Sequence, residues 1–419
     1  MVTVTAPPIE DGAVWISGHR VRAAGAWTDL KDSLQVAHEP VVDLGNVIVF
    51  PGWVNAHCHL DYTDMAGQLL RPRAFPDWIK AILTAKSSWG VEEFKTSWLK
   101  GAQQLLQSGT TTVANIESMP EILAEVRSKT PLRLFSFLEM TGVRNQLPGK
   151  EIVNKAIALL ESLPATRGGL GLSPHAPYST YPDLLAECAA AAKQGWLLTT
   201  HVAESQAEFD MYMYRRGPMF DWLESQRSMK DCGLGSPIGH LARHGLLSPN
   251  LLAVHANYAW NDDVRLLASQ GVSVAHCPRS HSYFRHRCFP MDEMLNFGVN
   301  VCLGTDSLAS VTLQRDSPPS LSMSAELRDL HLAHPSLRYR QSIRMASQNG
   351  ARALGLKGVV GELSPGSLAD LAFIPFSGPL TGVEPALVGY SQPVEGTMIG
   401  GAWEWLAAPW KDRLGHEQR

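Results

Sequence analysis

Short runs of apolar, largely β-branched residues alternate with longer segments of helical periodicity through the middle of the chain. Eight such runs have the length and composition of buried strands, namely residues 47–55, 110–116, 132–140, 170–175, 197–202, 251–256, 272–277 and 299–304. Apolar residues recur with helical spacing between them, most clearly at 91–108, 150–163, 181–194 and 262–270. Asn261 is the expected N-cap of the last helix. Strands that alternate with helices predict an α/β fold, a (β/α)8 barrel of the TIM type.

The two ends of the chain lack this alternation. Residues 1–50, and those from 358 onward, show the pattern of short strands and turns without a strong helical periodicity. We therefore expect a small β-sandwich domain assembled from both termini, residues 1–50 and 358–419, and a catalytic barrel domain at 51–357. A doubly wound sheet is the competing arrangement, but no GxGxxG motif follows a predicted strand.

Composition excludes several classes of protein. The chain has 419 residues, 45% hydrophobic and 18% charged, with a formal charge of −4. This charge predicts no binding to nucleic acid. No long segment is continuously apolar, so no membrane association is expected. Six scattered cysteines without a CxxC pair, and the lack of a basic and apolar leader, predict a cytoplasmic protein with reduced thiols.

Histidines gather at the carboxyl ends of the predicted strands. Six of the 15 histidines lie there, namely His57, His59, His175, His201, His255 and His276. Asp306 follows the eighth strand. In a parallel barrel these strand ends lie on one face, so that residues distant in sequence meet there. His57 and His59 alternate with Cys58, so both imidazoles point to the same side of an extended strand.

Three of these histidines and the aspartate form a candidate metal site. His57, His59, His201 and Asp306 offer nitrogen and oxygen ligands that suit one divalent ion, with a position left for water. Zn2+ is the expected ion, and Fe2+ and Mn2+ are the alternatives. A bound divalent ion lowers the pKa of its water to about 7 and so supplies hydroxide at neutral pH. Any one of these residues alone would more often be a core histidine or a turn aspartate, but buried polar groups need partners, and the combination favours a metal.

Four motifs resemble those of the amidohydrolase superfamily. They are PGWVNAHCHL at 51–60, HVAES at 201–205, HCPRS at 276–280 and GTDS at 304–307. Within this superfamily they resemble the metal-dependent deaminases of cytosine and adenosine derivatives, and most nearly the aminofutalosine deaminases. The resemblance implies that the four metal ligands are those given above. It also implies a homodimer.

The resemblance further assigns catalytic and substrate-binding residues. It implies that Glu204, three residues beyond His201, is the acid/base group, and that His255 lies beside the metal-bound water. Asp306 takes the proton of that water. The expected substrate contacts are His175, His276, Arg279, His281, Trp78 and Tyr178. His281 departs from the Ser-Asn sequence that often ends the seventh-strand motif in the superfamily.

The expected function is hydrolytic deamination of a small heterocyclic substrate. Metal-bound hydroxide attacks the amino-bearing carbon of a purine-type nucleoside or related heterocycle, aminofutalosine among them, and ammonia leaves. Neither 132–140 nor 170–175 contains a lysine that could bridge two metals, so we expect a single ion. One alternative is a related hydrolase that removes chloride or cleaves an amide or cyclic amidine C–N bond. The other is a non-catalytic relative of the barrel.

Overall fold

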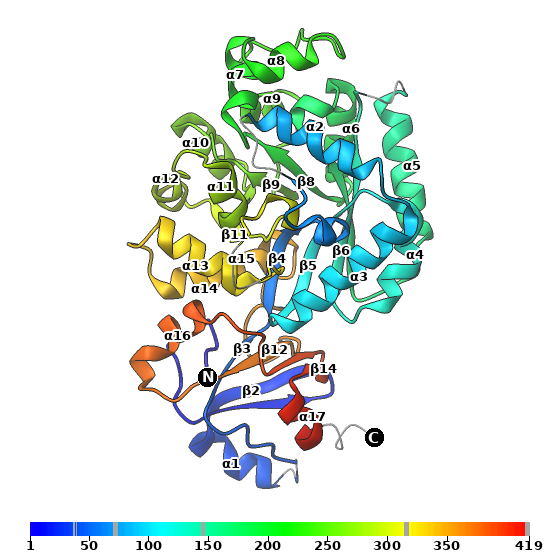
Figure 1. The fold of residues 1–419 in the computed structure, drawn as a ribbon. Coiled ribbons are helices and arrows are strands. Elements are labelled where there is room, and N and C mark those ends of the chain that lie inside the picture. Colours follow the sequence, from blue (N-terminus) through cyan, green and yellow to red (C-terminus); the bar gives the residue numbers. More distant parts are fainter. Residues whose placement is uncertain (37, 39, 70–73, 144–146, 314–317, 415–419) are drawn as a thin grey trace.

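Eight parallel strands form the central sheet of the protein, in sequential order from β4 to β11 (Figure 1). The computed structural model describes residues 1–36, 38, 40–69, 74–143, 147–313 and 318–414. The strands are β4 (Trp53–Cys58), β5 (Thr110–Glu117), β6 (Arg133–Met140), β7 (Gly168–Pro174), β8 (Leu197–Val202), β9 (Leu251–His255), β10 (Ser273–His276) and β11 (Asn300–Leu303). Every residue of β4, β5 and β9 is buried, as expected for parallel strands that helices cover.

The first and last of these strands meet and bring the sheet close to a closed barrel. An isolated parallel bridge joins Cys58 to Asp306, and the Asp306 N–H donates to the carbonyl oxygen of His57 at 3.1 Å. The Asn55 side chain spans the same seam, because its Oδ1 accepts from Thr305 N–H at 3.1 Å and its Nδ2 donates to Thr305 Oγ1 at 2.8 Å. The seam therefore sets His57 beside Asp306, although 249 positions separate them in the sequence.

Helices surround the sheet (Figure 1). They are α2 (Phe75–Lys86), α3 (Val91–Gln107), α4 (Leu123–Val126), α5 (Gly149–Ser162), α6 (Pro182–Lys193), α7 (Gln206–Tyr214), α8 (Pro218–Leu223), α9 (Pro237–Arg243), α10 (Asn261–Ser269), α11 (Pro278–Phe284), α12 (Met291–Asn296), α13 (Met323–Ala333), α14 (Tyr339–Met345) and α15 (Gln348–Ala353). Short 3-10 turns are η1 (Leu60–Met65), η2 (Pro120–Ile122), η3 (Arg127–Lys129), η4 (Pro177–Ser179) and η5 (Leu308–Ser310). None of the described helices combines the length and the apolar stretch that crossing a bilayer requires.

The start of α10 corrects one prediction. Asn261 is the first residue of the helix, and Trp260 precedes it as the cap. The Trp260 backbone N–H donates to Asp263 Oδ2 at 3.0 Å, so a side chain within the first turn satisfies the group before the helix. Asparagine is a common N-cap residue, but in this helix the side chain of Asp263 forms the capping hydrogen bond.

Segments from both ends of the chain form two antiparallel sheets, which lie together below the barrel in the view of Figure 1. One is the hairpin of β1 (Gly12–Ser17) and β2 (Arg20–Ala26), and the other has the order β14-β13-β12-β3, with β3 (Val47–Pro51), β12 (Leu371–Pro375), β13 (Gly396–Ile399) and β14 (Ala402–Leu406). Val21 of the hairpin packs in one apolar cluster with Leu371 and Met398 of the larger sheet. The barrel with an antiparallel unit from the two termini is therefore confirmed.

Two expectations about the terminal segments were wrong. These segments also contain helices, α1 (Trp27–Val36), α16 (Val383–Gly389) and α17 (Ala408–Leu414), with the short turn η6 (Leu380–Gly382). The expected strand 47–55 is two strands, because β3 pairs with β12 while β4 pairs with β5. The chain changes sheets at Gly52, where an added Cβ would lie 2.1 Å from Thr111 Cγ2. The apolar run 47–55 does not show with which strand each of its halves pairs. The domain boundaries after residue 50 and before residue 358 stay a prediction.

A buried ion pair ties the barrel to the terminal sheets. Arg133 of β6 reaches Asp370 with two contacts, Nε to Oδ2 at 2.5 Å and Nη2 to Oδ1 at 3.0 Å. The Asp370 side chain is inaccessible to solvent, and its Oδ1 also accepts from the Gly400 N–H at 2.7 Å. This bidentate geometry is the strong form of a carboxylate–guanidinium contact.

Candidate metal centre and catalytic cavity

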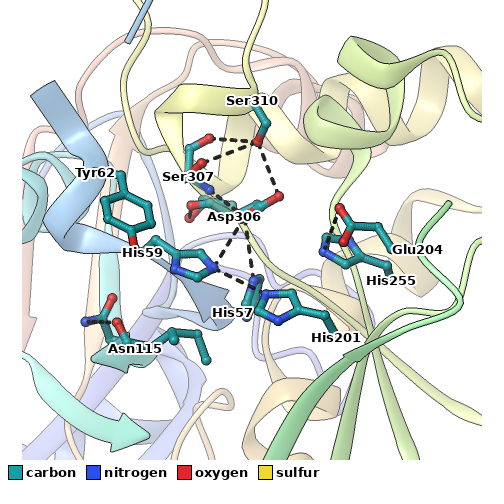
Figure 2. Close-up of polar contacts among 12 residues, drawn as sticks. His57, His59, Tyr62, Asn115, His201, Glu204, His255, Asp306, Ser307 and Ser310 are labelled. Atoms are coloured by element: carbon teal, nitrogen blue, oxygen red, sulfur yellow. Dashed lines mark hydrogen bonds and ion pairs between the residues drawn. The ribbon is translucent and has the colours of Figure 1, made fainter. Parts of the chain in front are cut away.

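The four predicted metal ligands meet at the carboxyl end of the barrel (Figure 2). His57 and His59 come from the end of β4, His201 from β8 and Asp306 from the turn after β11. Asp306 Oδ1 lies 3.6 Å from His57 Nε2 and 3.8 Å from His59 Nε2, and His59 Nε2 lies 3.3 Å from His201 Nε2. All four side chains are buried. Ring and carboxylate atoms at these separations can surround one cation.

The chemistry of these donors fits a metal ion. Both ring nitrogens of His57 and the Nδ1 of His59 are buried without a hydrogen-bond partner in the described chain, which is unfavourable unless another group supplies one. Burial lowers the pKa of His59 well below its ordinary value, and lowers the pKa of His201 to about 3, so both imidazoles keep a free lone pair at neutral pH. Burial raises the pKa of the Asp306 carboxyl, but the neighbouring His57 and His255 outweigh burial and hold it well below its usual range. Neutral imidazoles around a carboxylate are the ligand forms that divalent ions take.

Groups around the four residues fix their orientation. The Nδ1 of His201 lies 2.8 Å from the carbonyl oxygen of His175, so its Nε2 is the nitrogen left for a metal. The Ser307 N–H donates to Asp306 Oδ1 at 2.7 Å, and the Ser310 hydroxyl donates to Oδ2 at 3.3 Å (Figure 2). Such outer contacts set the tautomer of a ligand histidine and the direction of a ligand carboxylate.

Glu204 and His255 form a second buried pair beside this cluster (Figure 2). Glu204 Oε1 lies 3.5 Å from His255 Nε2. Burial, together with the negative charges of Asp306 and Glu208, raises the pKa of the Glu204 carboxyl well above its ordinary value, which favours its protonated form. The His255 nitrogen also belongs to a group with His57 and His201 whose atoms lie within 4.8 Å of one another. Its Nε2 faces Glu204, so we assign it to the acid/base pair rather than to the metal.

The loops that carry these side chains have an unusual backbone. Ala203, His255, Ala256 and Asp306 all have positive φ angles, from 49° to 71°. Left-handed backbone at residues other than glycine persists only where the surroundings enforce it, and it gathers at functional sites. Here the loop after β8 is joined to the loop after β9, because Tyr258 N–H donates to Ala203 O at 2.9 Å and Asn257 Nδ2 donates to Glu204 O at 3.0 Å.

A cavity of about 300 Å³ opens onto the cluster. Its lining includes the metal candidates His59, His201 and Asp306 together with Glu204 and His255. The inner side of α2 and the end of α8 contribute a mostly apolar wall of Phe75, Trp78, Ile79, Ile82, Leu83, Trp222 and Leu223. A concave apolar space with a few converging polar groups is the usual form of a small-molecule site.

The structure separates the six predicted substrate contacts into two groups. Trp78, His175 and Tyr178 line the cavity. His276, Arg279 and His281 are absent from its described lining. Their partners lie elsewhere: His276 stacks on Phe289 with centroids 4.1 Å apart, the Arg279 guanidinium pairs with the fully buried Glu326, and His281 Nδ1 lies 3.0 Å from Asn257 Oδ1. These contacts place the three side chains outside the described lining, and their part in substrate binding stays a prediction.

Other cavity residues were not anticipated as substrate contacts from the sequence. Tyr62, Lys86 and Glu139 line the cavity at the side of β4 and β6. Lys86 follows Ile79, Ile82 and Leu83 at helical spacing. That spacing places it on the inner face of α2, and this pattern could have identified it. Tyr62 stacks on His59 with ring centroids 5.4 Å apart.

Comparison with known proteins identifies relatives along nearly the whole chain. Residues 48–403 match the model of the amidohydrolase family. A 5-methylthioadenosine/S-adenosylhomocysteine deaminase of Thermococcus onnurineus is 30% identical over 357 residues, which are 84% of this chain and 79% of that protein.

Solved structures show the same fold. An adenosine deaminase from Xanthomonas campestris with bound zinc superposes with a TM-score of 0.79 at 22% identity, covering 97% of this chain and 94% of the other. The Helicobacter pylori aminofutalosine deaminase in complex with methylthio-coformycin gives a TM-score of 0.81 at 22% identity, covering 95% and 96%. At this identity the likeness concerns the architecture alone.

Proposed function

The chain belongs to the amidohydrolase family and is a hydrolase of carbon–nitrogen bonds other than peptide bonds, and on that premise we propose that it deaminates adenine nucleosides. The reaction adds water to the amino-bearing carbon of the purine, leaves a carbonyl there and releases ammonia. The observation that carries the proposal is the position of the Glu204–His255 pair beside the cluster of His57, His59, His201 and Asp306, at the inner end of one cavity. The relatives named for methylthioadenosine and S-adenosylhomocysteine support the nucleoside class.

A divalent ion, when bound, would supply the nucleophile. His57, His59, His201 and Asp306 would hold one divalent ion, for which we propose Zn2+, and such an ion ionises a water molecule at neutral pH. We also keep a cytoplasmic location and a homodimer as predictions.

The residues of the chain move the protons. The Glu204 carboxyl, protonated because burial raises its pKa, donates to the ring nitrogen next to the attacked carbon. Asp306 accepts the proton that the attacking water gives up and delivers it to the amino group, which leaves as ammonia. The proton of the new hydroxyl group then returns to Glu204 as the carbonyl forms, so that protons balance over one turnover. His255 lies 3.5 Å from Glu204 Oε1 and orients that carboxyl.

The test is ammonia release by the metal-loaded protein. Adenosine, 5-methylthioadenosine and S-adenosylhomocysteine are supplied separately, beside a chlorinated triazine and a cyclic amide as controls. We expect ammonia from at least one adenine nucleoside and neither chloride nor amine from the controls. No ammonia from any nucleoside, with chloride or ring-opened product from a control, would overturn the proposal in favour of another leaving group.

A further inference from the structure

Two further charged side chains line the cavity, and we call the part of the lining that they form the charged corner. Lys86, at the end of α2, and Glu139, at the end of β6, both line the cavity. Tyr62 connects this corner to the metal cluster, because its ring stacks on His59 and the Lys86 Nζ lies 4.8 Å from the centroid of the same ring. The charged corner therefore adjoins the side of the cavity that the metal candidate His59 lines.

Lys86 has hydrogen-bonding capacity to spare. Its ammonium donates to the Tyr62 hydroxyl and, at 3.4 Å, to Ser118 Oγ. Both acceptors are neutral, and an ammonium has three N–H donors. In the part of the chain that the structure describes, no carboxylate oxygen lies within 4.0 Å of the Lys86 nitrogen. Asp61 is linked to Lys86 only through Ser118, whose hydroxyl donates to Asp61 Oδ2 at 2.5 Å. One donor of a half-buried cation thus remains for a ligand.

Glu139 can accept hydrogen bonds that no described group of the chain donates. Its side chain is 16% exposed, and no hydrogen bond to its carboxylate is formed within the described chain. The nearest ring nitrogen, His175 Nε2, lies 3.9 Å from Oε1. At that distance the imidazole makes no hydrogen bond to the Glu139 carboxylate. Glu139 can accept hydrogen bonds from a cationic group of a ligand.

The two charges select opposite charges on the ligand. Lys86 and Glu139 do not pair with each other within 4.0 Å, so each can contact a different group of one molecule. An α-amino acid end, with its carboxylate and its ammonium, matches both. An apolar substituent in the same place would bury both charged groups without partners, which is unfavourable.

We propose that Lys86 and Glu139 form a subsite for the zwitterionic end of an amino-acid-bearing adenine nucleoside such as S-adenosylhomocysteine, and that this subsite makes such a nucleoside a better substrate than one with an apolar 5′ substituent. Lys86 binds the carboxylate and Glu139 binds the ammonium. The proposal rests on the proposed function, because it takes the adenine ring to lie at the metal cluster.

The experiment measures kcat/KM of the metal-loaded full chain for S-adenosylhomocysteine, 5-methylthioadenosine and adenosine. The wild type is compared with Lys86→Met and with Glu139→Gln, which remove one charge each at nearly constant volume. Lys80→Met is the matched control, since Lys80 lies on the same helix but outside the cavity lining. Metal content and thermal melting are recorded for every variant to confirm that it is folded.

We expect S-adenosylhomocysteine to be the best of the three substrates for the wild type. Each cavity variant should lower kcat/KM for this substrate by about 10-fold to 100-fold, the range for a lost hydrogen bond to a charged group, and leave the other two within about threefold. Lys80→Met should change none of them. Equal losses on all three nucleosides would mean that the corner contacts the shared ribose or supports the fold, and would overturn the proposal, as would an unchanged preference.

The two proposals fail in different ways. If the metal-loaded wild type released ammonia from no nucleoside, the proposed function would be overturned, and the subsite would be judged by calorimetric Kd for S-adenosylhomocysteine. A Kd equal in wild type and Lys86→Met, or no binding at all, would then contradict the subsite as well. Weaker binding by the variant alone would support it.

Discussion

Replacing Glu204 by glutamine isolates the proton transfer from the rest of the site. Gln has the same shape as Glu, and Glu204 belongs to neither of the described groups of side chains that could hold a metal. Glu204→Gln therefore removes the proton that the carboxyl donates while the cluster of His57, His59, His201 and Asp306 stays intact. Glu204 is 5% exposed, so bulk water does not readily replace its carboxyl as the acid.

The size of the effect follows from the role. A positioned general acid contributes about 10²-fold to 10⁴-fold to a rate, which is about 3–5 kcal/mol of transition-state stabilisation. We expect kcat to fall by that factor, and the metal content of Glu204→Gln to equal that of the wild type. Ammonia release from the best nucleoside gives kcat, and elemental analysis of the same sample gives the metal content.

A surface substitution provides the comparison. Glu187→Gln neutralises a carboxylate on α6, outside the cavity lining, and should leave kcat unchanged. If Glu204→Gln kept kcat within about tenfold of the wild type while holding its metal, Glu204 would not be the acid. If it lost the metal, the separation between ligands and acid/base pair argued above would be wrong.

Two further predictions concern stability. Arg279→Ala leaves the buried Glu326 carboxylate without its partner, so the free energy of unfolding should drop by about 3–5 kcal/mol while KM stays unchanged. A higher KM at normal stability would instead show that Arg279 contacts the substrate. Burial raises the pKa of Glu117 from 4.5 to about 7, so the folded state retains a proton that the unfolded state loses, and stability declines as pH rises from 5 to 8. Glu117→Gln should reduce this decline by about 3 kcal/mol in urea titrations at the two pH values, whereas an identical decline in both proteins would show that Glu117 is ionised in the folded state at pH 5.

The sequence was sufficient for the barrel and for bringing the metal candidates together. A parallel barrel places the ends of all its strands on one face, so histidines at strand ends converge whatever the details of packing. His57, His201 and Asp306 required only that topology. The same topology brings His255, at the end of β9, to this face. The acid/base part of Glu204, three residues after His201, was implied by the resemblance to the amidohydrolase superfamily and not by the strand order.

Side-chain partners between distant elements were not predictable in this way. The partner of Arg279 is Glu326 on α13, 47 positions later, and no local periodicity relates the two. His276 ends a strand as the other histidines do, yet it packs against Phe289 instead of facing the cavity. The division of 47–55 into two strands was missed for a similar reason, because residues in both halves are equally apolar and only their partners differ.

Elemental analysis of the purified protein determines whether His57, His59, His201 and Asp306 bind one divalent ion that activity requires. We predict one equivalent of a single divalent metal per chain in the wild type, loss of both metal and ammonia release in His201→Ala, and neither loss in His19→Ala at the surface. Full activity in wild-type protein that contains no divalent metal would contradict the claim, and so would His201→Ala that keeps its metal and its activity.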